Sequence, residues 1–279
     1  MLMQLDKKPT QVTEFSIELI EKRPASPISR PPLLFIHGAY TAAWCWQPHF
    51  LDYFADAGYD CFAVSLRDHG GSGAPHGAGG WSIADYASDV NLAMDEVVAK
   101  TGRNPILVGH SMGGFLALMV SRNRAVSGLA LLATVPPEGL IGSALHLFWR
   151  HPQLLWELNV IHHGGHPPRL AKLRELLFSD AVPECELQHY ANLFAQESDR
   201  ALLDMTLPQF DLRTPLGHPP AFVLASRHDM LMPAHLSQSA AHFLGVKAEL
   251  VDGVGHLMML DGRWQLAAEP LLHWLEELP

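Results

Sequence analysis

A fold in which helices cover both faces of a mostly parallel β-sheet is predicted for this chain by two observations. Short apolar runs alternate along most of the sequence with stretches whose apolar residues recur at helical spacing, and such alternation is typical of parallel strands joined by crossover helices. The 279 residues, 48% of them hydrophobic and 17% charged, suffice for about two ordinary domains or for one large α/β domain with an insertion. This composition also excludes intrinsic disorder.

The expected strands are one alternating segment and six apolar runs. From Glu14 to Leu19, polar and apolar residues alternate with the period of a strand that has one wet face. A proline-rich turn from Arg23 to Pro32 follows it. The apolar runs are residues 33–36, 61–66, 106–108, 128–134, 221–225 and 248–251.

Helix signals lie between these runs, where a parallel sheet requires them. Phe50 and Phe54 are four residues apart and precede Gly58, a typical residue at a helix end. Ser82 and Asp85 have the spacing of a capping box at a helix start. The sequence therefore predicts a helix after the second strand and another after the third.

The alternation stops between residues 137 and 217, where no β-rich run occurs. Leucines recur at helical spacing from Leu170 to Leu177, and prolines interrupt the region. We therefore expect an α/β core formed by residues 1–136 and 218–279, with residues 137–217 as a helical insertion on the sheet.

The net charge indicates which partners the protein binds, and the cysteine content indicates the compartment in which it works. The formal net charge is -10, a poor complement to phosphate backbones, so we expect no nucleic-acid partner and no stable membrane association. Three widely spaced cysteines fit no metal-ligand pattern and indicate reduced thiols. With no apolar run of about 18 residues, a soluble cytoplasmic protein is expected.

One motif carries recognisable chemistry. Residues 109–113 read G-H-S-M-G, directly after an expected strand and before an apolar helical stretch. This is G-x-S-x-G in the strand-turn-helix context that exposes a serine on a sharp, strained turn, and the glycines leave room for close packing around it. We predict that Ser111 is a nucleophile; the alternative is an ordinary serine at a glycine-eased turn.

A serine nucleophile needs a base, and the base needs an orienting acid. His256 follows the last expected strand on a glycine-rich loop, and Asp229 follows the strand before it. The order serine, aspartate, histidine is the one found when a G-x-S-x-G serine acts with such partners. Glu138, after the run 128–134, is the competing acid.

Acyl transfer also requires hydrogen-bond donors for the oxyanion that develops on the substrate. The strand 33–36 ends in His37 and Gly38, so the amide of Ala39 is expected to join the amide of Met112. We expect His37 to brace this loop rather than to take part in catalysis.

With these parts in order, the chain resembles the α/β-hydrolase superfamily over nearly all of its length outside the insertion. Residues 37–39 (H-G-A) and 44–46 (W-C-W) look like the plant methylesterase and hydroxynitrile lyase branch. Residues 65–73 and 255–261 look closer to small bacterial hydrolases of the lysophospholipase-like and carboxylesterase-like kind.

The resemblance implies a catalytic triad, an oxyanion hole and a cap domain formed by the insertion. The residues that it carries across are Ser111, Asp229 and His256 for the triad, and Ala39 and Met112 for the oxyanion hole. Lyases of the plant branch keep a lysine just after the catalytic histidine, whereas Leu257 follows here. Cyanohydrin cleavage therefore loses support.

The expected function is a cofactor-free serine hydrolase that cleaves a small or medium apolar ester, thioester or lactone. A lyase, perhydrolase or cofactor-less oxygenase on the same triad, or a non-catalytic receptor, remain alternatives, because fold alone does not fix function. A serine at residue 111 excludes the haloalkane dehalogenases and epoxide hydrolases that use an aspartate there.

Large apolar side chains gather between residues 145 and 156 of the insertion, where they either roof the substrate or bury the insertion against the sheet. The residues expected to bind substrate are Tyr40, Leu145, Phe148, Trp149, Trp156 and Leu257. His162, His163 and His166 lie in a glycine- and proline-rich stretch without a suitably spaced carboxylate. We therefore expect no metal site and no cofactor.

Overall fold

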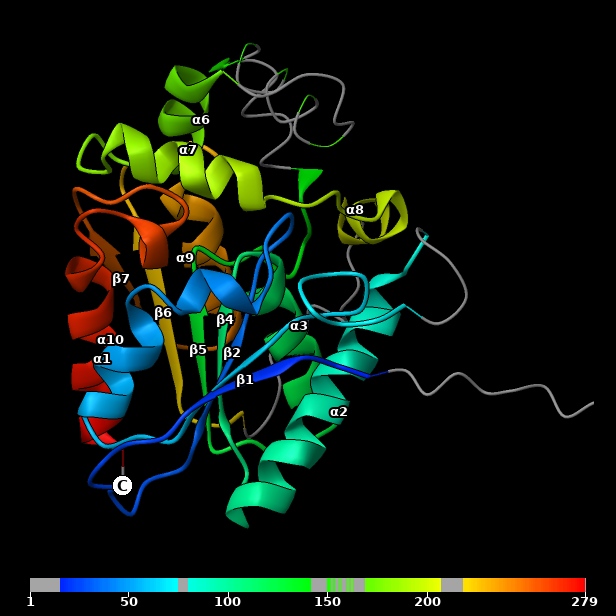
Figure 1. The fold of residues 1–279 in the computed structure, drawn as a ribbon, viewed down its shortest axis with the longest axis vertical. Helices are drawn as coiled ribbons and strands as arrows, with labels where there is room; N and C mark the ends of the chain where they lie inside the picture. The colour runs from blue at the N-terminus through cyan, green and yellow to red at the C-terminus, as the bar shows by residue number, and fades with distance from the viewer. Residues whose placement is uncertain are drawn as a thin grey trace, which may run out of the picture.

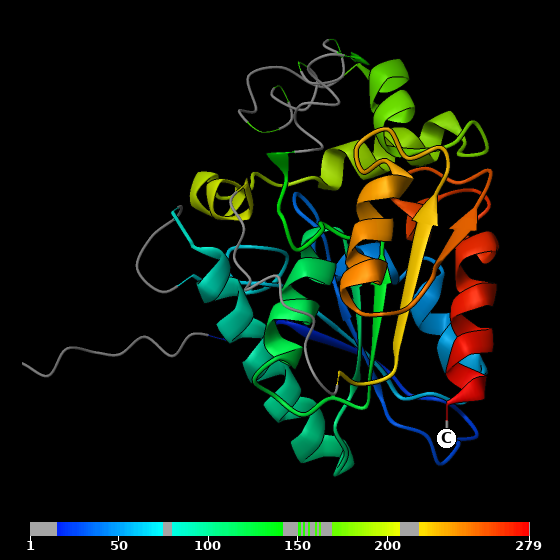
Figure 2. The same cartoon turned by 180° about the vertical axis from the view of Figure 1, so that it is seen from behind.

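The computed structural model describes residues 16–74, 80–141, 169–206 and 218–278, together with residues 150, 151, 153, 156, 160 and 162. Figures 1 and 2 show these residues as a sheet between two layers of helices, with further helices above one edge of the sheet.

Seven strands form the central sheet in the described part of the chain. Across the sheet they are β1 (Leu19–Lys22), β3 (Cys61–Val64), β2 (Leu33–Ile36), β4 (Ile106–His110), β5 (Gly128–Leu132), β6 (Ala221–Ser226) and β7 (Ala248–Val251). Only β1, at one edge, runs antiparallel to its neighbour, and the other pairs are parallel. The predicted α/β class with a mostly parallel sheet is confirmed.

Alternation of side chains along each strand divides the core into two layers. In β2, Leu33 and Phe35 face α1 (Phe50–Asp56) and α10 (Gln265–Glu277). Leu34 and Ile36 face the other layer, in which the helices are α2 (Ile83–Thr101), α3 (Met112–Ser121) and α9 (Ala234–Phe243). Both faces of the sheet are therefore apolar and covered, as the continuous apolar runs predict.

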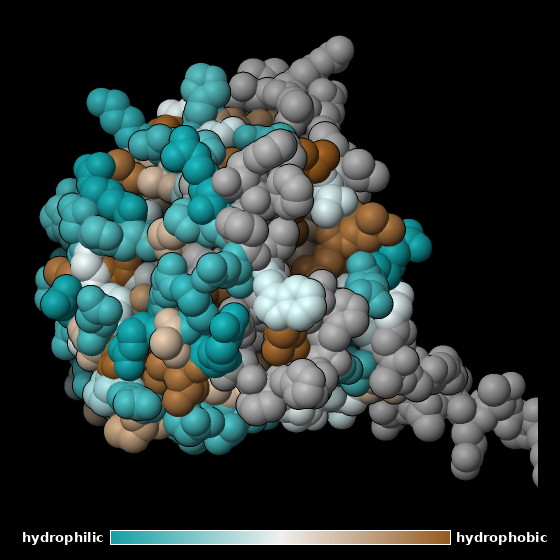
Figure 3. Space-filling view, turned by 90° about the horizontal axis from the view of Figure 1, so that it is seen from above, coloured by the Kyte–Doolittle hydropathy of each residue, from teal (hydrophilic) through white to brown (hydrophobic). Residues whose placement is uncertain are grey.

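Three helices whose bounds the structure describes lie between β5 and β6 in sequence and above the carboxyl ends of the parallel strands in space (Figures 1 and 2). They are α6 (Leu170–Leu177), α7 (Glu184–Leu193) and α8 (Asp199–Thr206). Buried side chains of α6 and α7 join one core layer and those of α8 join the other. Seen from above, hydrophilic side chains predominate toward α7, and apolar surface appears toward α8 (Figure 3).

Short 3-10 helices complete the described elements: η1 (Ala43–Trp46) follows β2, and η2 (Met258–Leu260) follows β7. None of the helices in the described ranges is both long and apolar enough to cross a bilayer. The cysteines are free thiols, with Cys45 and Cys61 buried and Cys185, on α7, exposed.

The first strand begins later than the alternating pattern predicts. β1 covers Leu19–Lys22, and the residues before it that the structure describes are not strand. The carbonyls of Ser16 and Glu18 accept hydrogen bonds from the amides of Gly73 and Ser65, which belong to the loop after β3. Because that loop is not a strand, no ladder extends over this part of the pattern.

A buried ion pair ties the same loop to α2. Asp89 is fully buried and accepts hydrogen bonds from Arg67, from its amide at 2.9 Å and from Nη2 at 2.6 Å. Asp85, which closes the predicted capping box with Ser82, lies 3.3 Å from Nη1 of Arg67. A buried carboxylate is stable only when it is paired and hydrogen-bonded. The bonds from Asp89 to Arg67 therefore hold the loop after β3 in one position against α2.

We predict that Asp89→Ala lowers the free energy of unfolding by about 3–5 kcal/mol, because it leaves the Arg67 guanidinium without its buried partner. Urea denaturation followed by circular dichroism measures the loss. The control is Asp95→Ala on the same helix, whose ion pair with Arg124 is exposed and is worth less than about 1 kcal/mol. Equal losses in the two variants would contradict this assignment.

Candidate active site

Ser111 lies at the turn between β4 and α3 with a backbone conformation that side-chain-bearing residues rarely adopt. Its φ is 52° and its ψ is -115°, and the surrounding packing holds it there. A Cβ on Gly113 would lie 2.2 Å from the carbonyl oxygen of Ile36, and one on Gly109 would lie 2.3 Å from the carbonyl oxygen of Gly113. Only glycine fits at both positions, as the motif predicts.

Asp229 and His256 come together at the carboxyl ends of the parallel strands, where Ser111 also lies. Asp229 follows β6 and His256 follows β7, and Nδ1 of His256 donates a hydrogen bond to Oδ2 of Asp229 at 2.7 Å. The other carboxylate oxygen accepts the amides of Leu231 and Met232 at 2.9 and 2.6 Å. The acid is thus fixed in position, and Asp229, not Glu138, is the carboxylate bonded to this histidine.

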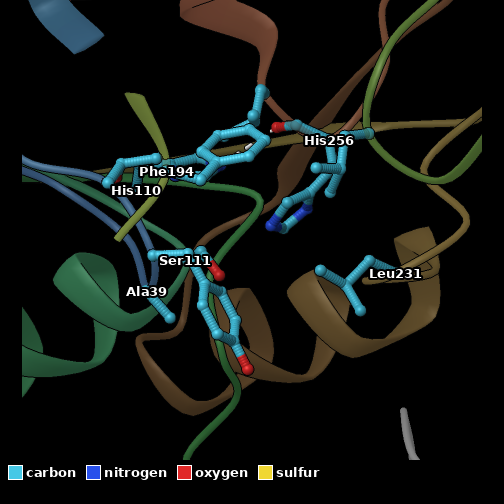
Figure 4. A pocket seen from close by; sticks show the side chains of 10 residues that line it. Ala39, His110, Ser111, Phe194, Leu231 and His256 are labelled. Atoms are coloured by element: carbon cyan, nitrogen blue, oxygen red, sulfur yellow. Dashed lines mark hydrogen bonds between the residues drawn. The ribbon is translucent and has the colours of Figure 1, made fainter. Parts of the chain in front are cut away.

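Ser111 and His256 line one pocket, and the imidazole of His256 is turned toward Ser111 (Figure 4). Both residues are buried, at 8% and 3% exposure. The hydrogen bonds of the described residues do not include one between these two side chains. Hydrogen bonds of this kind in enzyme sites commonly tighten only when a ligand is bound.

The loop after β2 approaches the serine from the other side. Ala39 lines the pocket beside Ser111. A Cβ on Gly38 would lie 2.8 Å from Nδ1 of His110 and 3.1 Å from Cβ of Ser111, so the backbone passes close to the turn. Met112 begins α3, its side chain is buried in the core, and it is not among the residues that line the pocket.

Two buried histidines brace these loops in the neutral form. His37 accepts the amide of Leu66 at Nε2 and donates from Nδ1 to the carbonyl of Gly38. Burial lowers the pKa of His37 to about 3 and lowers the pKa of His110 well below its usual value. His110 donates from Nε2 to the main-chain carbonyl of His256 at 3.0 Å, which links the turn at Ser111 to the loop that carries His256.

The rest of the pocket is mainly apolar. The residues lining it are Ala39, Tyr40, Thr41, His110, Ser111, Leu177, Phe194, Leu231, His256 and Leu257. Leu177 belongs to α6 and Phe194 follows α7, so the inserted helices supply part of the wall. Tyr40 has a φ of 65°, and its hydroxyl lies 3.4 Å from Nδ1 of His162. Nε2 of His162 lies 2.6 Å from Oδ1 of Asp199.

The predicted substrate-binding residues are only partly brought together here. Tyr40 and Leu257 line the pocket, whereas Leu145, Phe148 and Trp149 lie outside the described residues. The position of Trp156 differs from the prediction, because this residue is 65% exposed and does not line the pocket. An apolar stretch does not specify which of its faces turns toward solvent.

Sequence reasoning missed several lining residues. Leu231 lies two positions after Asp229 and could have been found from that loop. Leu177 closes the leucine pattern of the insertion. Phe194 has no sequence signal that places it near residue 111.

Comparisons with known proteins agree with this architecture. The model of the Alpha/beta hydrolase family matches residues 33–268. The mouse sn-1-specific diacylglycerol lipase ABHD11 is 24% identical over 251 residues, covering 83% of this chain and 76% of that protein. Human Protein ABHD8 is 36% identical over 81 residues, which are 29% of this chain and 18% of that protein. This shorter match spans about a fifth of the length of ABHD8.

Solved structures with a similar fold include an esterase from Exiguobacterium antarcticum, with a TM-score of 0.70, 21% identity, and coverage of 94% of this chain and 96% of that chain. An enol-lactonase from Burkholderia xenovorans has a TM-score of 0.69 at 18% identity, covering 96% of this chain and 99% of that one. Since the family model matches well over half of the sequence, this chain belongs to the Alpha/beta hydrolase family.

Proposed function

We propose that this protein is a serine hydrolase that needs no cofactor and cleaves a small or medium apolar carboxylic ester, thioester or lactone. The hydrogen bond between His256 and Asp229, at 2.7 Å beside Ser111, is the observation that carries the proposal. Family membership supports hydrolysis as the reaction class.

The first half-reaction forms an acyl-enzyme. His256 accepts the proton of the Ser111 hydroxyl as Oγ attacks the substrate carbonyl, and Asp229 stabilises the resulting imidazolium. The amides of Ala39 and Met112 stabilise the negative charge on the carbonyl oxygen. His256 then gives its proton to the leaving alcohol or thiol, and the carbonyl re-forms as an ester on Ser111.

The second half-reaction repeats these roles with water. His256 accepts a proton from water, the hydroxide attacks the acyl carbonyl, and the proton returns to Oγ of Ser111 as the carboxylic acid leaves. Three hydrogen bonds hold the carboxylate of Asp229 in place during both half-reactions. It therefore orients the base without taking part in proton transfer.

An apolar wall supports the choice of substrate class. Leu177, Phe194, Leu231 and Leu257 line the pocket around Ser111, and apolar lining favours apolar groups on the substrate. In this proposal residues 137–217 act as the cap. Leu257 gives this wall an apolar side chain directly after His256, where the resemblance to the plant lyases would require lysine.

We predict that Ser111→Ala lowers kcat for a p-nitrophenyl ester by about four to six decades while the protein stays folded, because no other group replaces the nucleophile. Initial rates and thermal denaturation measure the two effects. A fluorophosphonate probe should label the parent protein but not the variant. The control Ser88→Ala, on the exposed side of α2, should keep full activity; turnover by Ser111→Ala at the parent rate would refute the proposal.

Asp229→Asn should lower kcat by roughly four decades, because an amide favours the wrong tautomer of the His256 imidazole. Glu138→Gln is the matched control and should change kcat little, since Glu138 is not bonded to His256. Steady-state kinetics on one ester compares them. The opposite ranking would place the acid after β5 instead of after β6.

We expect kcat/KM to increase from acetyl to mid-length acyl esters and to fall for long chains. Each additional buried methylene contributes up to about 0.8 kcal/mol until the pocket is full. The profile is measured with p-nitrophenyl esters of increasing length, for the parent and for Leu231→Ala. A profile that decreases steadily from acetate and ignores this substitution would show that the acyl group binds elsewhere.

A further inference from the structure

Residues 194–198, which connect α7 to α8, contribute lining residues to two cavities. Phe194, at one end, lines the pocket that holds Ser111 (Figure 4). Glu197 and Ser198, at the other end, line a second, polar cavity together with His69 and Tyr86. The position of this segment therefore affects the shape of the first pocket.

Glu197 is a fully buried carboxylate that bridges this segment to the core. Its Oε1 accepts the hydroxyl of Tyr86, on α2, at 2.6 Å and the amide of Ser198 at 2.7 Å. Its Oε2 lies 3.3 Å from Nε2 of His69, and neither side chain of that pair is more than 1% exposed. One acidic group thus joins the inserted region to two different parts of the core.

Glu197 and His69 each favour the charged form of the other. Nδ1 of His69 donates to the carbonyl of Arg67 at 2.8 Å, so Nε2 is the ring nitrogen that faces the carboxylate. Burial alone would lower the pKa of His69, but Glu197 raises it above its usual value. Burial would likewise raise the pKa of Glu197, but His69, Tyr86 and Ser198 lower it.

Two further hydrogen bonds fasten the same segment to the site. The amide of Ala195 donates to the carbonyl of Tyr40 at 3.0 Å, and Oγ of Ser198 donates to the carbonyl of Trp81 at 2.6 Å. Tyr40 lines the pocket next to Ala39. Displacement of the segment would therefore move Phe194 and the loop after β2 together.

Apolar packing already attaches the inserted helices to the core, through Tyr190 and Leu187 of α7 and Ala201 and Met205 of α8. A buried carboxylate adds little net stability to this attachment, because the free energy of desolvating it offsets much of what its pairing contributes. What it adds is direction, since hydrogen bonds and charge fix a position that apolar contact leaves adjustable.

We propose that Glu197 is a positioning residue that locks residues 194–198 onto the core and thereby determines which acyl groups the pocket accepts. This inference rests on the proposed esterase function and deepens it. In the proposed mechanism the reacting atoms are served by the triad and by the amides of Ala39 and Met112, so Glu197 acts on the binding of the acyl chain and not on the chemical step.

The test compares Glu197→Ala and Glu197→Gln with the control Glu175→Ala, whose ion pair with Lys172 on α6 is exposed. For a mid-length p-nitrophenyl ester, Glu197→Ala should raise KM about tenfold, whereas kcat for the acetyl ester should stay within about twofold of the parent. Glu197→Gln keeps the shape and the acceptor for Tyr86 and should restore part of the loss. The control should match the parent.

Hydrogen exchange by mass spectrometry supplies a readout that needs no turnover. Peptides containing residues 194–198 should exchange faster in Glu197→Ala than in the parent, while peptides from β4 and β5 should not. Because Glu197→Ala leaves His69 without its partner, Tyr86→Phe provides a milder second variant expected to shift exchange and KM in the same direction.

Unchanged exchange in residues 194–198, or an equal loss of kcat/KM for acetyl and mid-length esters, would overturn the positioning role. If the parent protein hydrolyses no ester, the proposed function fails, and the acyl preference inferred from it fails too. The exchange data would then still decide whether Glu197 fixes the segment.

Discussion

Close packing of three strands around one turn is the constraint on which the site depends. A Cβ on Gly109, Gly113 or Gly114 would lie between 2.2 and 2.4 Å from atoms of the turn itself, of β2 or of the residues after β5. The strained conformation of Ser111 persists because the surrounding strands leave the chain no alternative path. The sheet thus fixes the direction in which the hydroxyl points before any other group of the site is in place.

The carboxyl edge of the sheet is also where buried polar groups gather. Inside the sheet the strands are apolar on both faces, so polar side chains find partners only where the ladders end. His37, His69, His110, Asp229 and His256 all follow or end a strand and are all buried. Each makes at least one hydrogen bond to a neighbouring main-chain group or to another member of the set. The same edge therefore holds both the proposed chemistry and its supports.

Features encoded locally could be predicted from the sequence. The apolar runs predicted six strands to within a few residues, and the glycines around Ser111 predicted the turn, because both depend on neighbours in the chain. The order of Ser111, Asp229 and His256 located all three side chains that the structure gathers near one pocket. The start of β1 was misplaced because residues 16 and 18, just before it, bond to the loop after β3, and no periodicity in the sequence reveals the shape of that loop.

Features encoded by distant contacts could not be predicted. Phe194 and Glu197 lie in a short connection without a motif, and their roles appear only once α7 and α8 are placed over the strands. Trp156 shows the same limit, since composition marks it as apolar but the direction of its side chain depends on the packing of the insertion. Sequence reasoning therefore described the core of the site better than its walls.

The distribution of thiols makes this protein convenient for selective labelling. Burial raises the pKa of both the Cys45 and the Cys61 thiol, and both side chains are closed to solvent, so alkylating reagents meet neither as a thiolate. Cys185, near the start of α7, is exposed. A maleimide dye added to the native protein therefore attaches to the inserted helices alone, and it reports their motion relative to the sheet without any engineered cysteine.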